Sequence, residues 1–291
     1  MATGTGNGNG NGNGNGNGNG NGNGNGNGNG MSQASVASLF ASAAQAGVIS
    51  PGTSTLLTGN LGAVVIAGAA GMDLEDIVAS DVTLVTVLID ASSSIESAGL
   101  EAAIRDGQNA LLDAFAASRE KDSILVAVWT FSGEIRVLHS YVPVEDAARL
   151  DAANYAGLGA THLYDTWCDS LAANVAYAQR LRDGGTPCRS IVVVITDGED
   201  CGSRRSAADC ARISKDLLAS EQFVLAFVGV GDAVNFLPVA KCMGVPDGCV
   251  EVQAQATPAN LRKVFHMVSQ SAIRASQGLV APGAAAGFFR P

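Results

Sequence analysis

The residues best suited to chemistry follow an apolar run. Residues 82–89 are β-branched and almost wholly apolar, which predicts a strand buried on both faces of a mostly parallel sheet. The chain then turns polar at Asp90-Ala91-Ser92-Ser93-Ser94, which offers one carboxylate and hydroxyls on alternate residues. Hard oxygen ligands at the carboxyl end of a strand suit a hard cation. Helix N-capping is an equally good explanation of the same residues.

Two more segments place oxygen ligands beside expected elements. A Gly-rich connection over 155–162 carries Thr161 just before a helix expected at 163–181. The most continuous β run, 191–195, ends in Thr196-Asp197-Gly198. In an open α/β sheet, ligands bind outside the carboxyl ends of strands, so these positions are favourable.

The elements between these segments alternate between strand and helix. Strands are expected at 124–131, 135–142, 223–230 and 249–252, and helices at 95–119, 144–150, 206–220, 235–241 and 261–276. The turn at Ser132-Gly133-Glu134 predicts a hairpin. The fold class is therefore α/β, a doubly wound, mainly parallel open sheet with one antiparallel edge strand.

The order of the three segments resembles the von Willebrand factor A (integrin I-like) domain and its metal-ion-dependent adhesion site. That family's pattern is Asp-x-Ser-x-Ser, a distant Thr and an Asp-Gly turn, and the resemblance spans about residues 80–276. It implies metal ligation by Asp90, Ser92, Ser94, Thr161 and Asp197. Mg²⁺ is the implied ion, with Mn²⁺ or Ca²⁺ as alternatives, and one coordination position is left for an Asp or Glu carboxylate of a protein partner.

Neighbouring residues have plainer explanations. Asp165 fits a first-turn acid of a helix, Glu199 and Asp200 fit the rim of the crevice, and His162 fits a solvated loop residue. No Ser-His-Asp set, nucleophile elbow or phosphate loop is recognisable, which favours a non-catalytic binding module. The alternatives are a regulatory or adaptor subunit of an intracellular bacterial ATPase or conflict-system complex, and a self-assembling structural protein.

Composition limits the partners and the location. With 27 acidic and 17 basic residues the net charge is −10, which disfavours nucleic acid and anionic membrane surfaces. The apolar run at 61–71 is too short to cross a bilayer, so no membrane insertion is expected. No basic-then-apolar leader opens the sequence, so a cytoplasmic location is expected. The six cysteines leave two readings: free thiols, or loop disulfides Cys201/Cys210 and Cys242/Cys249 that would suit a secreted or cell-surface protein.

The chain divides into four expected segments. Residues 1–30 form a Gly-Asn low-complexity tail, through which homo-oligomerisation is an open alternative. Residues 31–80 form a small helical appendage that packs on the main domain or contacts a partner. Residues 81–277 form the α/β domain, and residues 278–291 a flexible C-terminal tail.

Overall fold

The computed structural model describes residue 1, residues 31–278 and residues 287–289. The expectations for the Gly-Asn tract, oligomerisation through it included, lie outside the described residues, as do those for most of the C-terminal tail. Within that tail, Phe288 is fully buried, and its carbonyl accepts a hydrogen bond from the Arg274 guanidinium at 3.0 Å.

A six-stranded sheet forms the centre of the molecule, in the order β3-β2-β1-β4-β5-β6. All neighbouring strands run parallel except the antiparallel pair β2 and β3. The bounds are β1 Val82–Asp90, β2 Ile124–Phe131, β3 Ile135–Pro143, β4 Cys188–Thr196, β5 Phe223–Val230 and β6 Val250–Gln253. The α/β fold class and the antiparallel edge pair predicted from the sequence are confirmed.

The continuous apolar runs explain the position of the strands. Every residue of β1, β2 and β5 is buried, as expected where helices cover both faces of a parallel sheet. The chain leaves β1 toward β2 and β3 on one side, then crosses to β4, β5 and β6 on the other. The carboxyl ends of β1 and β4 therefore meet where the strand order reverses, which is the usual ligand position in such sheets.

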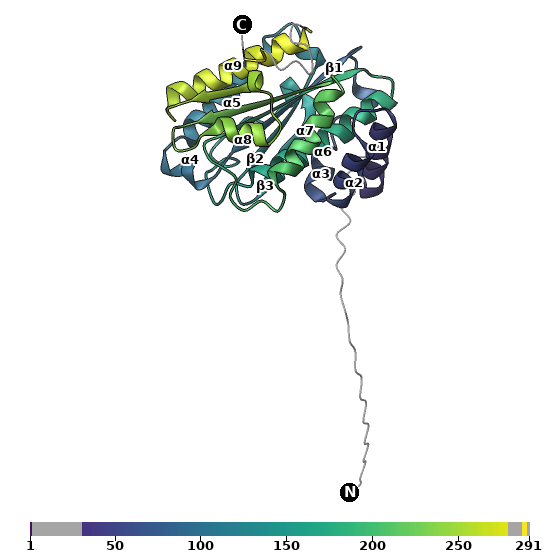
Figure 1. Cartoon of the computed structure of the whole chain (residues 1–291), viewed down its shortest axis with the longest axis horizontal. Helices are drawn as coiled ribbons and strands as arrows, with labels where there is room; N and C mark the ends of the chain where they lie inside the picture. Colours follow the sequence, from purple (N-terminus) through teal and green to yellow (C-terminus); the bar gives the residue numbers. More distant parts are fainter. Residues whose placement is uncertain (2–30, 279–286, 290–291) are drawn as a thin grey trace.

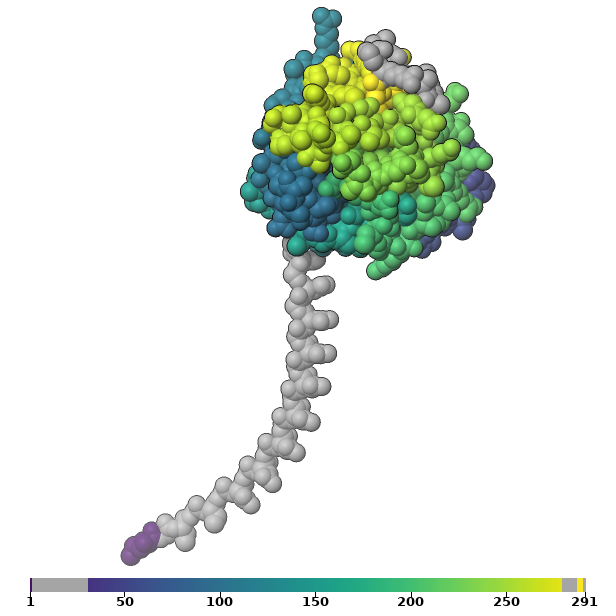
Figure 2. Space-filling model, turned by 60° about the vertical axis from the view of Figure 1, so that its left-hand side comes forward, coloured from purple at the N-terminus to yellow at the C-terminus, as the bar shows by residue number. Residues whose placement is uncertain are grey.

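Helices cover the sheet on both faces (Figure 1). The pair α5 (Glu101–Ala116) and α9 (Pro258–Ser276) packs together on one face, and the two segments lie side by side in Figure 2. The opposite face carries α6 (Leu163–Asp183) against β1 and β4, and α7 (Ala207–Ala219) against β5. Two short helices, α4 (Ser93–Ser97) and α8 (Phe236–Cys242), follow the ends of β1 and β5. The described helices include none with the length and apolarity needed to cross a bilayer.

Two expected helices differ from the structure. The helix expected at 95–119 is interrupted, because Gly99 adopts φ +67°, a left-handed conformation that ends α4 before α5 begins. The helix expected at 144–150 is only a 3₁₀ turn, Val144–Asp146. Side chains of α5 supply the missing partners beyond it: Gln108 and Asn109 accept from the Leu150 N–H at 3.1 and 3.0 Å. Tertiary hydrogen bonds therefore replace the local ones.

Residues 33–68 form α1 (Gln33–Gln45), α2 (Pro51–Gly59) and α3 (Ala63–Gly68). Helix α1 begins with a reciprocal capping box between Ser32 and Ser35, and its buried residues Val36, Phe40 and Ala43 lie on one face. Both α1 and α3 pack against α6, so these helices extend the layer over that face of the sheet (Figure 1). Their apolar residues belong to the same core as the sheet.

This shared core predicts that the N-terminal helices and the sheet unfold together. We expect Phe40→Ala to lower the free energy of unfolding by about 3–5 kcal/mol, the usual cost of removing a buried aromatic ring, because Phe40 is fully buried. The probe is the intrinsic fluorescence of Trp129 and Trp167, which lie on β2 and α6. Ser38→Ala, an exposed change on α1, is the matched control. An unshifted tryptophan transition in the Phe40→Ala variant would contradict the prediction.

Candidate functional site

Asp90 is the last residue of β1, and its side chain is held from two directions. Its Oδ1 accepts the Ser92 backbone N–H at 2.8 Å, and its Oδ2 accepts the Thr196 hydroxyl of β4 at 2.5 Å. Only 1% of Asp90 is exposed. The carboxylate therefore bridges the ends of the two strands at which the strand order reverses.

Ser92, Ser94 and Asp197 continue a chain of polar contacts from this carboxylate toward solvent. The Ser92 and Ser94 hydroxyl oxygens lie 2.9 Å apart, and the Ser94 hydroxyl donates to Asp197 Oδ1 at 2.8 Å. Ser92 occupies the N-cap position of α4, yet its side chain makes no capping hydrogen bond. The capping explanation of this motif is therefore wrong for the Ser92 hydroxyl, which faces Ser94 instead.

Thr161 lies beside the turn that carries Asp197. It forms an isolated antiparallel bridge with Cys201, in which the Cys201 N–H donates to the Thr161 carbonyl at 2.7 Å. Its hydroxyl oxygen lies 3.5 Å from the position that a Cβ on Gly198 would occupy. The structure thus brings all five sequence-predicted site residues to one end of the sheet.

The Gly-rich connection is held against the end of β1 by contacts that sequence reasoning missed. The Tyr155 hydroxyl donates to the Asp90 carbonyl at 2.5 Å, and the Leu158 N–H donates to the Ala91 carbonyl at 2.8 Å. A Cβ on Gly157 would lie only 2.8 Å from the Glu96 nitrogen, so this position requires the close backbone approach that glycine allows. The Gly-rich composition of this connection signalled a close backbone approach. It did not indicate that the end of β1 is the segment approached.

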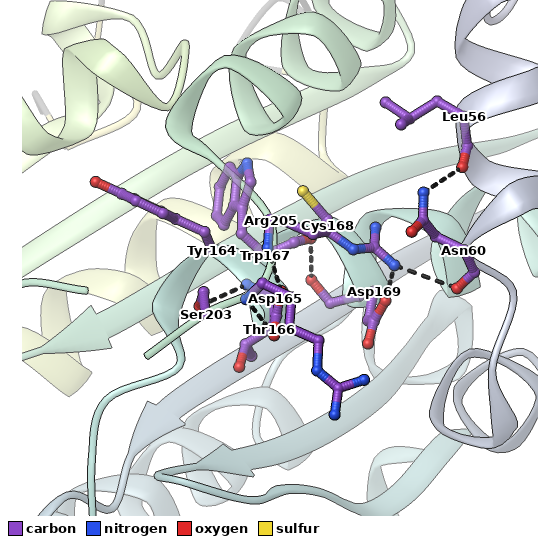
Figure 3. Close-up of polar contacts among 12 residues, drawn as sticks. Leu56, Asn60, Tyr164, Asp165, Thr166, Trp167, Cys168, Asp169, Ser203 and Arg205 are labelled. Atoms are coloured by element: carbon purple, nitrogen blue, oxygen red, sulfur yellow. Dashed lines mark hydrogen bonds and ion pairs between the residues drawn. The ribbon is translucent and has the colours of Figure 1, made fainter. Parts of the chain in front are cut away.

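The loop after β4 also caps α6, which begins directly after His162. Asp200 accepts the Tyr164 N–H at 3.0 Å. The Ser203 hydroxyl accepts the Asp165 N–H at 3.1 Å (Figure 3). The free N–H groups of the first turn are thus satisfied by another loop. Asp165, the expected first-turn acid, and Asp200, expected at the rim, both join the loop after β4 to α6. Glu199 is exposed.

Burial dominates the electrostatics of the two site carboxylates. Six apolar side chains line a small pocket with Asp90 and Asp197: Ile95, Leu100, Ile104, Ile195, Val230 and Leu261. Desolvation raises the pKa of Asp90 from 3.8 to about 6, against the hydrogen bonds from Thr196 and Ser92. Desolvation also raises the pKa of Asp197. Among the residues that the structure describes, neither carboxylate forms an ion pair.

The donor set consists entirely of oxygen. Within the described ranges no group of three or more His, Cys, Asp and Glu side chains is placed to hold a metal ion. The five residues supply two carboxylates and three hydroxyls instead. Asp90, Ser92 and Thr161 are buried, whereas Ser94 is exposed to solvent. Hard oxygen donors of this kind suit Mg²⁺, Mn²⁺ or Ca²⁺ better than metals that prefer nitrogen or sulfur.

Comparison with known families gives one match. Residues 85–250 match the von Willebrand factor type A domain, which covers more than half of the chain. A search of curated proteins gave no match.

Solved structures with a related fold include bacterial pilus proteins. The PilB minor pilin from Streptococcus sanguinis is 11% identical over 71% of this chain and 64% of that chain, with a TM-score of 0.50. The pilus adhesin SpaC from Lactobacillus rhamnosus GG is 12% identical over 67% of this chain and 31% of that chain, with a TM-score of 0.50.

The proximal thread matrix protein 1 from the mussel byssus is 20% identical over 76% of this chain, with a TM-score of 0.45. Another structure of that protein has zinc in its metal-ion-dependent adhesion site. The chain spans 51% of the length of the mussel protein in the first of these structures, and less than two thirds of PilB.

The buried charge predicts that neutralising Asp90 stabilises the metal-free protein. The folded-state pKa of Asp90 lies above its unfolded value, so ionisation opposes folding, and stability is lost as the pH rises from about 4 through 6. In metal-free buffer at pH 7 we expect Asp90→Asn to raise the free energy of unfolding by roughly 1–3 kcal/mol. Denaturant unfolding measures this difference, which is expected to vanish near pH 4.

Asp209 provides the matched control for this measurement. Hydrogen bonds from the Ser206 backbone and side chain lower the pKa of Asp209, so Asp209→Asn is expected to lower stability at pH 7. Equal destabilisation by both substitutions at pH 7 would contradict the assignment of Asp90 as an uncompensated buried charge.

Proposed function

The chain belongs to the von Willebrand factor type A domain family, and we propose that it is a non-catalytic, divalent-cation-dependent protein-binding module. Domains of this family are typically protein-binding adhesion modules. The proposed metal ligands are Asp90, Ser92, Ser94, Thr161 and Asp197, and the proposed partner group is a carboxylate.

One observation carries this proposal. Two carboxylates, Asp90 and Asp197, are joined through the hydrogen bonds of Ser92 and Ser94, and neither has an ion-pair partner among the described residues. Burial raises the pKa of Asp90, and the charge of Asp197 raises it further. Like charges in an apolar crevice are costly unless a cation compensates them. A divalent ion between them would remove that cost, and the adjacent hydroxyls supply neutral oxygen ligands.

The chain's own residues have distinct roles in this proposal. Asp90 is fixed by Thr196 and the Ser92 N–H, so it forms the rigid floor of the site. Ser94 and Asp197 lie at the more exposed rim, where their mutual hydrogen bond keeps both oxygens near the entrance. A cation held there would supply an open coordination position that a partner's Asp or Glu can fill.

The surface beside the site offers an apolar contact for the partner. Leu158, on the Gly-rich connection, is 73% exposed although its backbone N–H is hydrogen-bonded to Ala91. A large apolar side chain fixed beside a metal site suits a partner that presents a carboxylate next to an apolar group. We therefore propose that Leu158 contributes to partner affinity without contributing to metal affinity.

The biological setting of the partner is a separate part of the proposal. The site chemistry fits a surface adhesion partner and an intracellular complex, such as an ATPase with an exposed acidic residue, equally well. Both settings need the same carboxylate–cation contact. The identity of the protein recovered with the chain therefore distinguishes them.

The metal proposal is tested by calorimetric titration of the metal-free protein with MgCl₂, and separately with MnCl₂, CaCl₂ and ZnCl₂. We expect one site for Mg²⁺ and Mn²⁺ in the wild type and none in Asp197→Ala, because the rim carboxylate is lost. Glu199→Gln, an exposed change two residues away, is the matched control and is expected to bind normally. Equal Mg²⁺ affinity in wild type and Asp197→Ala would reject the site.

The partner proposal is tested by a pull-down from the native cells with the immobilised protein. We expect the specific partner to bind in Mg²⁺ and to be released by chelator. Asp197→Ala is expected to lose the partner together with the metal. Leu158→Ala is expected to bind Mg²⁺ normally and to lose about tenfold in partner affinity, because an apolar contact at the interface is lost. A partner retained in chelator would show that binding does not use the cation.

A further inference from the structure

Cys168 and Cys210 form a buried thiol pair between two helices. Cys168 lies on α6 and Cys210 on α7, 42 residues apart in sequence, and their sulfur atoms are 3.5 Å apart. Neither residue is exposed to solvent. A disulfide between Cys201 and Cys210 is one of the alternatives left open by the sequence. The fold instead places the Cys210 sulfur against that of Cys168.

Polar contacts near Cys168 hold the start of α7 against α6 (Figure 3). The Asp165 carboxylate accepts the backbone N–H groups of Arg204 and Arg205, at 3.1 and 2.9 Å. The Arg205 guanidinium in turn pairs with Asp169 at 2.5 Å. Asp165 and Asp169 lie on either side of Cys168 along α6. The chain segment that enters α7 is therefore fixed on the same turn of α6 that carries Cys168.

A second contact fixes α7 beyond Cys210. The Trp167 indole N–H donates to the Ser214 hydroxyl at 3.0 Å, and both side chains are fully buried. Trp167 precedes Cys168, and Ser214 lies one turn after Cys210 on α7. The two sulfurs thus face each other between contacts on both sides, so their proximity is built into the packing of α6 on α7.

We propose that Cys168 and Cys210 form a disulfide that joins α6 to α7 when the chain folds in an oxidising environment. The sulfurs need to approach from 3.5 Å to a bond length of about 2.05 Å. In the reaction with a disulfide oxidant such as oxidised glutathione, the two thiols lose two protons and two electrons. The oxidant's S–S bond breaks and yields two thiols.

The environment of the pair slows the exchange of this bond with dissolved thiols and disulfides. The hydrogen bond with Cys168 and burial both raise the pKa of the Cys210 thiol, so little thiolate exists in the folded protein at neutral pH. The thiolate is the form that exchanges with disulfides. The bond therefore forms while the chain folds, and once it is buried, dissolved thiols reduce it slowly.

The position of the bond relates it to the candidate site. Helix α6 follows Thr161, and α7 follows the loop that begins at Asp197. Joining these two helices near their N-termini fixes the spacing of two of the three segments that form the site. The proposal does not depend on metal binding, because the bond can form whether or not the proposed function is correct.

Peptide mapping provides the direct test. The full-length protein is reduced and unfolded, refolded in a mixture of reduced and oxidised glutathione, alkylated and digested with trypsin. Trypsin separates Cys168 (residues 150–180), Cys201 (residues 190–204) and Cys210 (residues 206–212) into different peptides. We expect 150–180 linked to 206–212. A link between 190–204 and 206–212, or alkylated Cys168 and Cys210 throughout, would overturn the proposal.

Thermal unfolding tests whether the link acts in the folded state. A bond that closes a loop of this length is expected to raise the melting temperature of the oxidised protein by roughly 5–10 °C over the reduced protein. Cys168→Ala is expected to abolish that difference, whereas Cys201→Ala, an exposed control, is expected to keep it. Loss of the difference in Cys201→Ala with retention in Cys168→Ala would contradict the assignment.

Discussion

The Asp90 carboxylate is the constraint on which the rest of the site depends. It ends a strand that is buried at every position, between the two strands β2 and β4. Its partners are a hydroxyl and a backbone N–H, which hold the oxygens in place without cancelling the charge. The fold thus keeps a charge where burial opposes it, at a cost in stability that is characteristic of functional sites.

The seating of this carboxylate requires loops from across the chain. The Tyr155 hydroxyl donates a hydrogen bond to the Asp90 carbonyl. At Gly157 the backbone of the Gly-rich connection packs closely against α4. The loop after β4 provides Thr196 to Asp90 and caps α6 through Asp200 and Ser203. Each segment is therefore positioned by the other two. The site is a property of the assembled fold, and a single motif would not form it.

The sequence predicted the parts of the structure that depend on local pattern. Continuous apolar runs located the buried strands. The polar residues at the ends of β1 and β4, together with the Gly-rich connection that carries Thr161, located the five candidate ligands. The last helix was expected at 261–276 and is found as α9 at Pro258–Ser276, with Thr257 at its N-cap and Pro258 at its first position. In each case the information lies within a few residues along the chain.

The parts of the structure that could not be predicted from the sequence depend on contacts between residues that are distant along the chain. The segment at 147–150 is not helical because Gln108 and Asn109 of α5 take its hydrogen bonds. Beneath α6, Asn174 donates to the Tyr141 hydroxyl at 2.8 Å and accepts from Ser190 at 2.6 Å. Neither arrangement has a local sequence signal, and the same holds for the pairing of Cys168 with Cys210 in place of Cys201.

The position of the cation is the most direct test of the account. Crystals of the full chain grown with MnCl₂ allow the ion to be located by its anomalous scattering. The account predicts one strong peak within coordination distance of Asp90, Ser92, Ser94 and Asp197, with Thr161 beside it. A Mn²⁺ peak elsewhere on the molecule, with these five side chains unchanged and bonded only to one another, would contradict it.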